Sequence, residues 1–232
     1  MKVTGERCIL GESGALLEKA HLARYEFALQ YLVDKKVLDM GCGSGYGTDL
    51  MASIASEVIG IDISEEAINC DRQRYKQENI KFYVGDVTNL DFLEDRQFDV
   101  IVSFEVIEHL TDCAQFLKES RRVLKDDGIL IISTPNKKYF SPGSEKPRNI
   151  FHVIEFELDD FKKLLREYFG GVTIYGQDYH SRIRAFVKKI LPKKAWVALR
   201  ARVGDAYNAK QSSSFSDSKV EDHSYFVAVC KK

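Results

Sequence analysis

The chain has 232 residues, of which 44% are apolar, and its formal net charge is −1. This composition excludes a disordered chain, and the balanced charge excludes broad electrostatic binding to nucleic acid. The length suits one domain with a large core, so we predict a single domain over residues 1–232.

The cysteines and the N-terminus bear on where the protein works. The chain has five cysteines and no C-x-x-C pair, which argues against a disulfide framework or a structural zinc site. A reducing cytoplasm fits this usage best. No apolar run approaches ~20 residues and the N-terminus lacks a signal-like apolar core, so we expect neither a membrane span nor secretion.

Residues 15–33 are the first predicted element, an amphipathic helix that forms an N-terminal cap within residues 1–34. Apolar side chains recur at spacings of three and four: Leu16, Leu17, Ala20, Ala23, Phe27 and Tyr31. His21, Arg24 and Tyr25 lie on or beside this stripe. Two readings stay open. The helix either packs with its arginine reaching to solvent, or covers a ligand that Tyr25 or Arg24 touches.

Residues 36–49, KVLDMGCGSGYGTD, carry the most informative pattern. An apolar run ends in Asp39, and glycines follow at positions 41, 43, 45 and 47. A strand that breaks into glycines and then enters a helix lets backbone N–H groups approach a ligand closely. The dinucleotide fingerprint would need glycine at 46 or 48, where Tyr46 and Thr48 stand instead.

This stretch resembles the first motif, VLDxGCGxG, of the class I S-adenosylmethionine (SAM) methyltransferases. The resemblance implies that SAM is the cofactor and that the motif residues Asp39, Gly41, Cys42 and Gly43 help to bind it. It also gives the covering helix a role, because Tyr25 would then contact the methionine end of SAM.

A second acid follows the next predicted strand, residues 57–61. Asp62 lies about 20 residues past the glycines, where an acid can accept two hydrogen bonds from a ribose diol. The alternative role of helix N-cap better suits Ser64, which precedes two glutamates. We therefore predict that Asp62 and its neighbour Ile63 contribute to the cofactor site.

Further elements alternate along the chain. After a helix at 64–77 and a strand at 80–84, Gly85-Asp86-Val87 matches the family's adenine-side motif, in which Asp86 and the Val87 backbone would meet the base. The remaining predicted strands are residues 98–103, 129–133, 172–175 and 224–230. Alternation of strands and helices predicts parallel pairing with right-handed crossovers. The expected fold is therefore α/β and Rossmann-like, with a seven-stranded, mostly parallel sheet covered by helices on both faces.

The end of the fourth strand carries the segment FEVIEHL. Glu105, Glu108 and His109 have spacings that place them on one face of a helical turn, and His152 follows later. Two carboxylates and two imidazoles could hold a divalent cation such as Mg²⁺, Mn²⁺ or Zn²⁺. Phe104 and Glu105 are also predicted to border the cofactor.

The pattern E-x-x-E-H, then T-P-N, then a later H followed by E-F is similar to two branches of the family. One methylates the 3′ terminal ribose of small RNAs with a metal held by two Glu and two His, here Glu105, Glu108, His109 and His152. The other comprises the ubiquinone-pathway O-methyltransferases. The chain lacks the arginine- and tryptophan-bearing segment of the RNA enzymes, so nucleic acid is a less favoured partner.

Other segments look closer to bacterial methyltransferases found with polysaccharide and glycosyl-transfer machinery. These are G-E-R…H-L-x-R-Y-x-F-A near the start and F-S-P-G…N-x-F-H-V-x-E-F after the fifth strand. The metal-free alternative also stays open, with Glu108 and His109 bonding each other and the backbone. A further role predicted for His109 is to take the acceptor's hydroxyl proton, because the pKa of a histidine side chain lies near working pH.

Residues 178–223 read as a basic helical insertion before the last strand. Segment 181–204 contains eight Lys/Arg and no acid, with apolar residues at helical spacing interrupted by Pro192. Three roles stay open: lid helices with a solvated basic face, recognition of a phosphate-bearing acceptor, or docking on an anionic membrane surface.

Three functions follow from these readings. The first is O-methylation of a sugar hydroxyl in glycan or nucleotide-sugar metabolism. The second is a metal-assisted O-methyltransferase acting on a catechol- or quinone-type small molecule or an RNA 3′ end. The third is a SAM-binding regulatory partner without turnover. The acceptor itself stays unassigned, because this fold builds its acceptor pocket from irregular segments.

Overall fold

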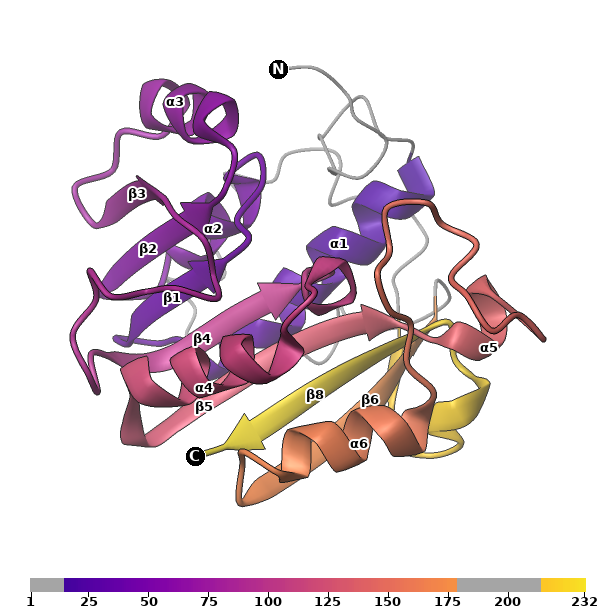
Figure 1. The fold of residues 1–232 in the computed structure, drawn as a ribbon. Coiled ribbons are helices and arrows are strands. Elements are labelled where there is room, and N and C mark those ends of the chain that lie inside the picture. Colours follow the sequence, from indigo (N-terminus) through magenta and orange to yellow (C-terminus); the bar gives the residue numbers. More distant parts are fainter. Residues whose placement is uncertain (1–14, 179–213) are drawn as a thin grey trace.

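A computed structural model describes residues 15–178 and 214–232 (Figure 1). These residues form one sheet of eight strands in the order β3-β2-β1-β4-β5-β8-β6-β7. The strands are β1 Lys36–Met40, β2 Glu57–Asp62, β3 Ile80–Val84, β4 Phe98–Phe104, β5 Leu124–Pro135, β6 Gly171–Asp178, β7 Ser214–Ser216 and β8 Tyr225–Lys231. The α-helices are α1 Ala15–Ala28, α2 Tyr46–Met51, α3 Glu65–Arg74, α4 Cys113–Val123, α5 Lys137–Phe140 and α6 Leu158–Arg166. Single 3₁₀ turns occur at η1 Leu29–Tyr31, η2 Ile107–His109 and η4 Val220–Asp222.

The Rossmann-like fold is confirmed, but the strand count is corrected. Strands β1 to β5 pair in parallel, whereas β8 is antiparallel to both β5 and β6. The additional strand is β7, which pairs antiparallel with the end of β6. It lies in the range predicted as an insertion, 178–223, where no strand was expected. Segment 181–204 lies outside the described residues.

Helices cover the sheet on both faces, as predicted, which suits parallel strands that are apolar on both sides. Successive residues of β1 point to opposite sides, so Leu38 packs in the cluster that α4 and α6 cover, and Val37 in the cluster that α1 and α2 cover. Figure 1 shows α4 and α6 on one face of the sheet and α1 crossing the other. The side chains of Val37 and Leu38 are both fully buried, so the core lies along the centre of the sheet.

The covering helix is shorter than predicted and more tightly attached. Residues 15–28 are α-helical and 29–31 form a 3₁₀ turn. Its arginine does not reach to solvent, because Arg24 is completely buried. The Arg24 Nε atom donates a hydrogen bond of 2.7 Å to Gln177 Oε1 on β6. The guanidinium also lies 4.3 Å from the Tyr225 ring centre on β8. A buried cation therefore joins α1 to the antiparallel end of the sheet.

Removing this cation should destabilise the fold. We expect Arg24→Ala to lower the free energy of unfolding by roughly 3 kcal/mol, because it leaves the buried Gln177 carbonyl unpaired and opens a cavity. Urea denaturation followed by circular dichroism measures the change. Lys35→Ala removes an exposed cation and should shift stability by less than about 0.5 kcal/mol. Equal effects of the two variants would contradict a structural role for Arg24.

Candidate functional site

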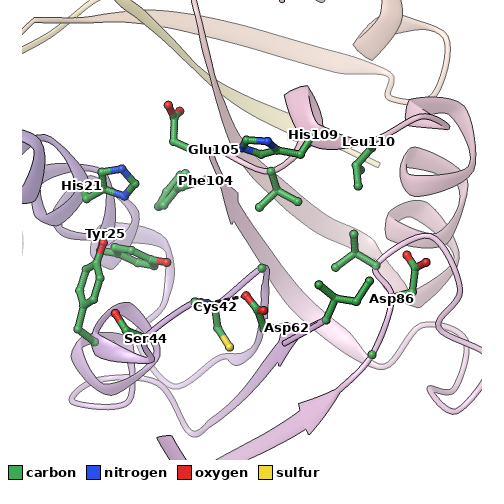
Figure 2. Close-up of a pocket in the computed structure, with 17 residues that line it drawn as sticks. His21, Tyr25, Cys42, Ser44, Asp62, Asp86, Phe104, Glu105, His109 and Leu110 are labelled. Carbon is green, nitrogen blue, oxygen red and sulfur yellow. Dashed lines mark hydrogen bonds between the residues drawn. The ribbon is translucent and has the colours of Figure 1, made fainter. Parts of the chain in front are cut away.

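A cavity of about 380 Å³ lies at the carboxyl ends of β1, β2 and β4 (Figure 2). Ligands of open α/β sheets bind at such strand ends, where the strand order reverses. All the residues predicted to bind the cofactor line this cavity except Asp39: Tyr25, Gly41, Cys42, Gly43, Asp62, Ile63, Asp86, Val87, Phe104 and Glu105. Six further lining residues were not predicted as ligands, although each lies within four residues of one that was: His21, Ser44, Tyr46, Gly85, Val106 and Leu110.

The glycine turn after β1 forms one wall of the cavity because side chains would not fit there. Gly41 has a φ of 80°, and a Cβ atom at this position would overlap the side chain of Val106. A Cβ atom at Gly47 would overlap the ring of Tyr25. The missing side chains let α1 lie directly over the turn, so that Tyr25 and His21 face the cavity (Figure 2).

Asp62 is held in place by the backbone around it. Its Oδ2 accepts a hydrogen bond of 2.9 Å from the N–H of Gly43, and its Oδ1 accepts one of 2.9 Å from the N–H of Ser64. A carboxylate has about four lone-pair sites, the kind of acceptor that a ribose diol needs. Ser64 caps α3 by accepting a hydrogen bond from the N–H of Ala67, which confirms its predicted N-cap role.

The adenine side of the cavity is formed after β3. Asp86 Oδ1 accepts hydrogen bonds from the Thr88 backbone N–H at 2.8 Å and from its hydroxyl at 2.7 Å. Ile63 presents an apolar side chain that is 74% exposed beside Asp62. An exposed apolar surface next to oriented carboxylates suits a ligand with a flat ring and polar edges.

Asp39, which was predicted to help bind the cofactor, is not among the residues that line the cavity. It is fully buried, and its Oδ2 accepts a hydrogen bond of 2.6 Å from the Thr48 hydroxyl. Its Oδ1 accepts a longer one, 3.4 Å, from the Tyr25 hydroxyl. Burial raises the pKa of Asp39 to about 7, although these two hydrogen bonds oppose the rise. Asp39 therefore joins β1, α2 and α1 beneath the site.

Three of the four predicted metal ligands lie together in the described part of the chain. Ligand atoms of Glu108, His109 and His152 all lie within 4.8 Å of one another. Glu105 is directed elsewhere: its Oε1 accepts a 2.7 Å hydrogen bond from Ser133 Oγ and lies 3.7 Å from Arg24 Nη2. The physical reason is its φ of 57°, which interrupts the helical spacing on which the prediction depended.

The two histidines are oriented by different partners. His109 Nδ1 lies 3.0 Å from the Phe151 carbonyl oxygen, so this nitrogen carries the proton and neutral Nε2 has the lone pair. His152 Nδ1 lies 2.8 Å from Glu155 Oε1. The two imidazole rings are 5.1 Å apart in an edge-on arrangement. Glu155 was missed as a functional residue, and its position three residues after His152 was the available signal.

Glu108 is fully buried beside these rings. Its Oε2 accepts a 3.3 Å hydrogen bond from the Thr134 hydroxyl, while its Oε1 has no hydrogen-bond partner within the described residues. Burial, together with the neighbouring charge of Glu105, raises the pKa of Glu108 well above its usual value. A buried carboxylate oxygen without a partner is a group that a cation or a ligand hydroxyl would satisfy.

Residues 33–173 match a family model described as a methyltransferase domain. The chain belongs to this methyltransferase family. SAM is the cofactor of the family, and the domain is that of a SAM-dependent methyltransferase. In the described residues, every helix is too short or too polar to cross a bilayer.

Two relatives and one solved structure show how far the similarity extends. A probable SAM-dependent methyltransferase of Mycolicibacterium smegmatis is 41% identical over 169 residues, which are 71% of this chain and 63% of that protein. A ubiquinone biosynthesis O-methyltransferase of Glaesserella parasuis is 34% identical over 128 residues, or 53% of this chain and 54% of the relative. The chain thus spans under two thirds of the first relative's length. A crystal structure from Thermotoga maritima, described as a possible histamine N-methyltransferase, superposes with a TM-score of 0.67 at 18% sequence identity. The match includes 94% of this chain and 91% of the Thermotoga maritima chain. At this identity the similarity shows the fold alone.

The buried Asp39 carboxyl should make stability depend on pH. Its folded pKa of about 7 exceeds the ordinary 3.8, so the folded state binds more protons between these values and loses stability as pH rises through that window. Relative to Asp39→Asn, the free energy of unfolding of the natural protein should fall by up to roughly 4 kcal/mol from pH 4 to pH 7. Urea titrations at several pH values measure this difference. If the difference in unfolding free energy between the natural protein and Asp39→Asn does not change with pH, the raised pKa of Asp39 is contradicted.

Proposed function

We propose that this chain transfers the methyl group of SAM to a hydroxyl oxygen, and that the acceptor is a sugar in glycan or nucleotide-sugar metabolism. The observation that carries the proposal is that one cavity is lined by Asp62 and the glycine turn and also by His109 (Figure 2). A cofactor bound between them would present its methyl group toward the histidine. This arrangement also argues against a regulatory partner without turnover, which would need no such histidine.

The chemistry needs little beyond orientation and one proton acceptor. The acceptor oxygen attacks the methyl carbon, the bond from carbon to sulfur breaks, and S-adenosylhomocysteine leaves. The hydroxyl proton passes to Nε2 of His109, whose ring is oriented by the Phe151 carbonyl. Because the sulfonium already activates the methyl group, most of the rate enhancement would come from placing the two reactants in line.

Glu108, His109 and His152 also fit a divalent cation. The buried Oε1 of Glu108 lacks a hydrogen-bond partner in the described residues, and Glu155 would orient His152 as a carboxylate commonly orients a metal-binding imidazole. Mg²⁺, Mn²⁺ or Zn²⁺ held there would supply Lewis-acid activation of the acceptor hydroxyl. The similarity to a ubiquinone biosynthesis O-methyltransferase favours the second candidate, metal-assisted methylation of a catechol- or quinone-type small molecule.

The choice of a sugar acceptor is supported by the sequence segments that resemble polysaccharide-associated methyltransferases. The basic stretch 181–204 suits a phosphate-bearing acceptor such as a nucleotide sugar or a lipid-linked glycan. A cytoplasmic location, predicted from cysteine usage, is compatible with both acceptor classes.

SAM binding tests the cofactor half of the proposal. We expect calorimetry to detect binding of SAM and S-adenosylhomocysteine but not of NADH. Asp62→Asn should weaken SAM binding at least roughly tenfold, because two hydrogen bonds to a charged acceptor are lost or weakened. The matched control is Glu65→Gln at the start of α3, outside the cavity lining, which should leave affinity unchanged. Binding of NADH without SAM would refute the proposal.

A methyl-transfer screen tests the acceptor half. Nucleotide sugars, glycans and catechols are assayed with labelled SAM, with and without EDTA. We expect His109→Ala to reduce turnover by roughly 100-fold or more while SAM affinity changes little, since the imidazole acts on the acceptor's proton. If a cation takes part, EDTA and Glu108→Gln should each reduce turnover, and added Mn²⁺ should reverse only the EDTA effect. Full turnover by His109→Ala would exclude the assigned proton acceptor.

A further inference from the structure

One asparagine side chain connects the two histidines of the candidate site. Asn149 lies in the segment between α5 and α6 (Figure 1). Its Nδ2 atom lies 2.9 Å from Nε2 of His152, and its Oδ1 accepts a hydrogen bond of 3.1 Å from the Phe151 N–H. The Phe151 carbonyl oxygen in turn lies 3.0 Å from Nδ1 of His109. The amide of Asn149 therefore contacts one imidazole directly and is connected to the other through Phe151.

These contacts fix which atoms of Asn149 and His152 face each other. A backbone N–H can only donate, so the Asn149 atom bonded to Phe151 is the oxygen, and the amide NH₂ group points at His152. An amide NH₂ group is a donor, so Nε2 of His152 accepts this hydrogen bond with its lone pair. Nδ1 of His152 then carries the proton and donates to Glu155 Oε1 at 2.8 Å. Both nitrogens of this imidazole are thus hydrogen bonded.

The partner Glu155 determines which nitrogen of His152 a cation could use. The Glu155 side chain is fully buried and that of His152 is 7% exposed, so water does not replace their hydrogen bond. Oε2 of Glu155 already lacks a hydrogen-bond partner in the described residues, and separating the pair would leave the whole buried carboxylate without a donor. Nε2 is therefore the nitrogen that remains for a cation. A metal ion binds the lone pair that Nε2 now shares with Asn149, so the amide and the ion exclude each other.

We propose that Asn149 competes with a divalent cation for Nε2 of His152 and thereby sets the cation affinity of the candidate site. That site consists of Glu108, His109 and His152, whose ligand atoms lie within 4.8 Å of one another. A cation that binds all three must displace the Asn149 amide, so the hydrogen bond to Nε2 opposes binding. Because the same amide holds Phe151, its displacement also loosens the carbonyl that orients His109. The proposal rests on the cation site of the proposed function and concerns affinity, not methyl transfer.

Calorimetry with Mn²⁺ tests the competition on the full chain, without SAM or acceptor. Asn149→Ala removes the competing amide, so we expect it to raise the Mn²⁺ affinity roughly three- to tenfold, the equivalent of one hydrogen bond. A residue that only supported the site would lower the affinity when removed. The matched control is Asn69→Ala at an exposed position of α3, which should leave the Mn²⁺ affinity unchanged. Calorimetric SAM binding by each variant shows that it is folded.

The gain in affinity should also depend on His152. In a His152→Ala background, Asn149→Ala should bring no gain, because no imidazole is left to release. A gain of the same size in that background would overturn the proposal. So would an unchanged or lower Mn²⁺ affinity when Asn149→Ala is made in the natural protein. If neither the natural protein nor Asn149→Ala binds Mn²⁺, the competition is refuted together with the cation site, whereas proton transfer to His109 is decided separately by the methyl-transfer screen.

Discussion

A buried carboxyl joins the three elements that shape the cavity. Asp39 on β1 accepts hydrogen bonds from Thr48 on α2 and from Tyr25 on α1. An acid in this position is costly to ionise, so the donors around it must stay in place for the fold to be stable. The same tyrosine lies over Gly47, where a side chain would not fit. The positions of the glycine turn, the covering helix α1 and Asp39 therefore depend on one another.

The two halves of the site are built in different ways. The cofactor half consists of strand ends and short turns, and its key carboxylate, Asp62, is held by two backbone N–H groups. The acceptor half depends on the η2 turn and on the segment after α5, which bonds to the Glu108 carbonyl. A shift of that segment would therefore move His109 and His152 as well.

Family membership assigns SAM as the cofactor but does not select the acceptor. Strand ends that bind the same nucleoside vary little in geometry, whereas the acceptor meets irregular segments that differ between members of a fold. In this chain those segments combine imidazoles and a buried acid with exposed apolar and basic side chains.

The sequence by itself determined the features that depend on local pattern. Apolar runs located the strands, glycine spacing located the turn, and Ser64 marked the start of a helix, because each follows from steric or capping rules that act over a few residues. Tertiary structure decided the burial of Arg24, the scaffold role of Asp39 and the departure of Glu105 from the histidine cluster. It also added β7 to the edge of the sheet. These outcomes depend on partners distant in sequence or on one backbone angle, and periodicity carries no information about either.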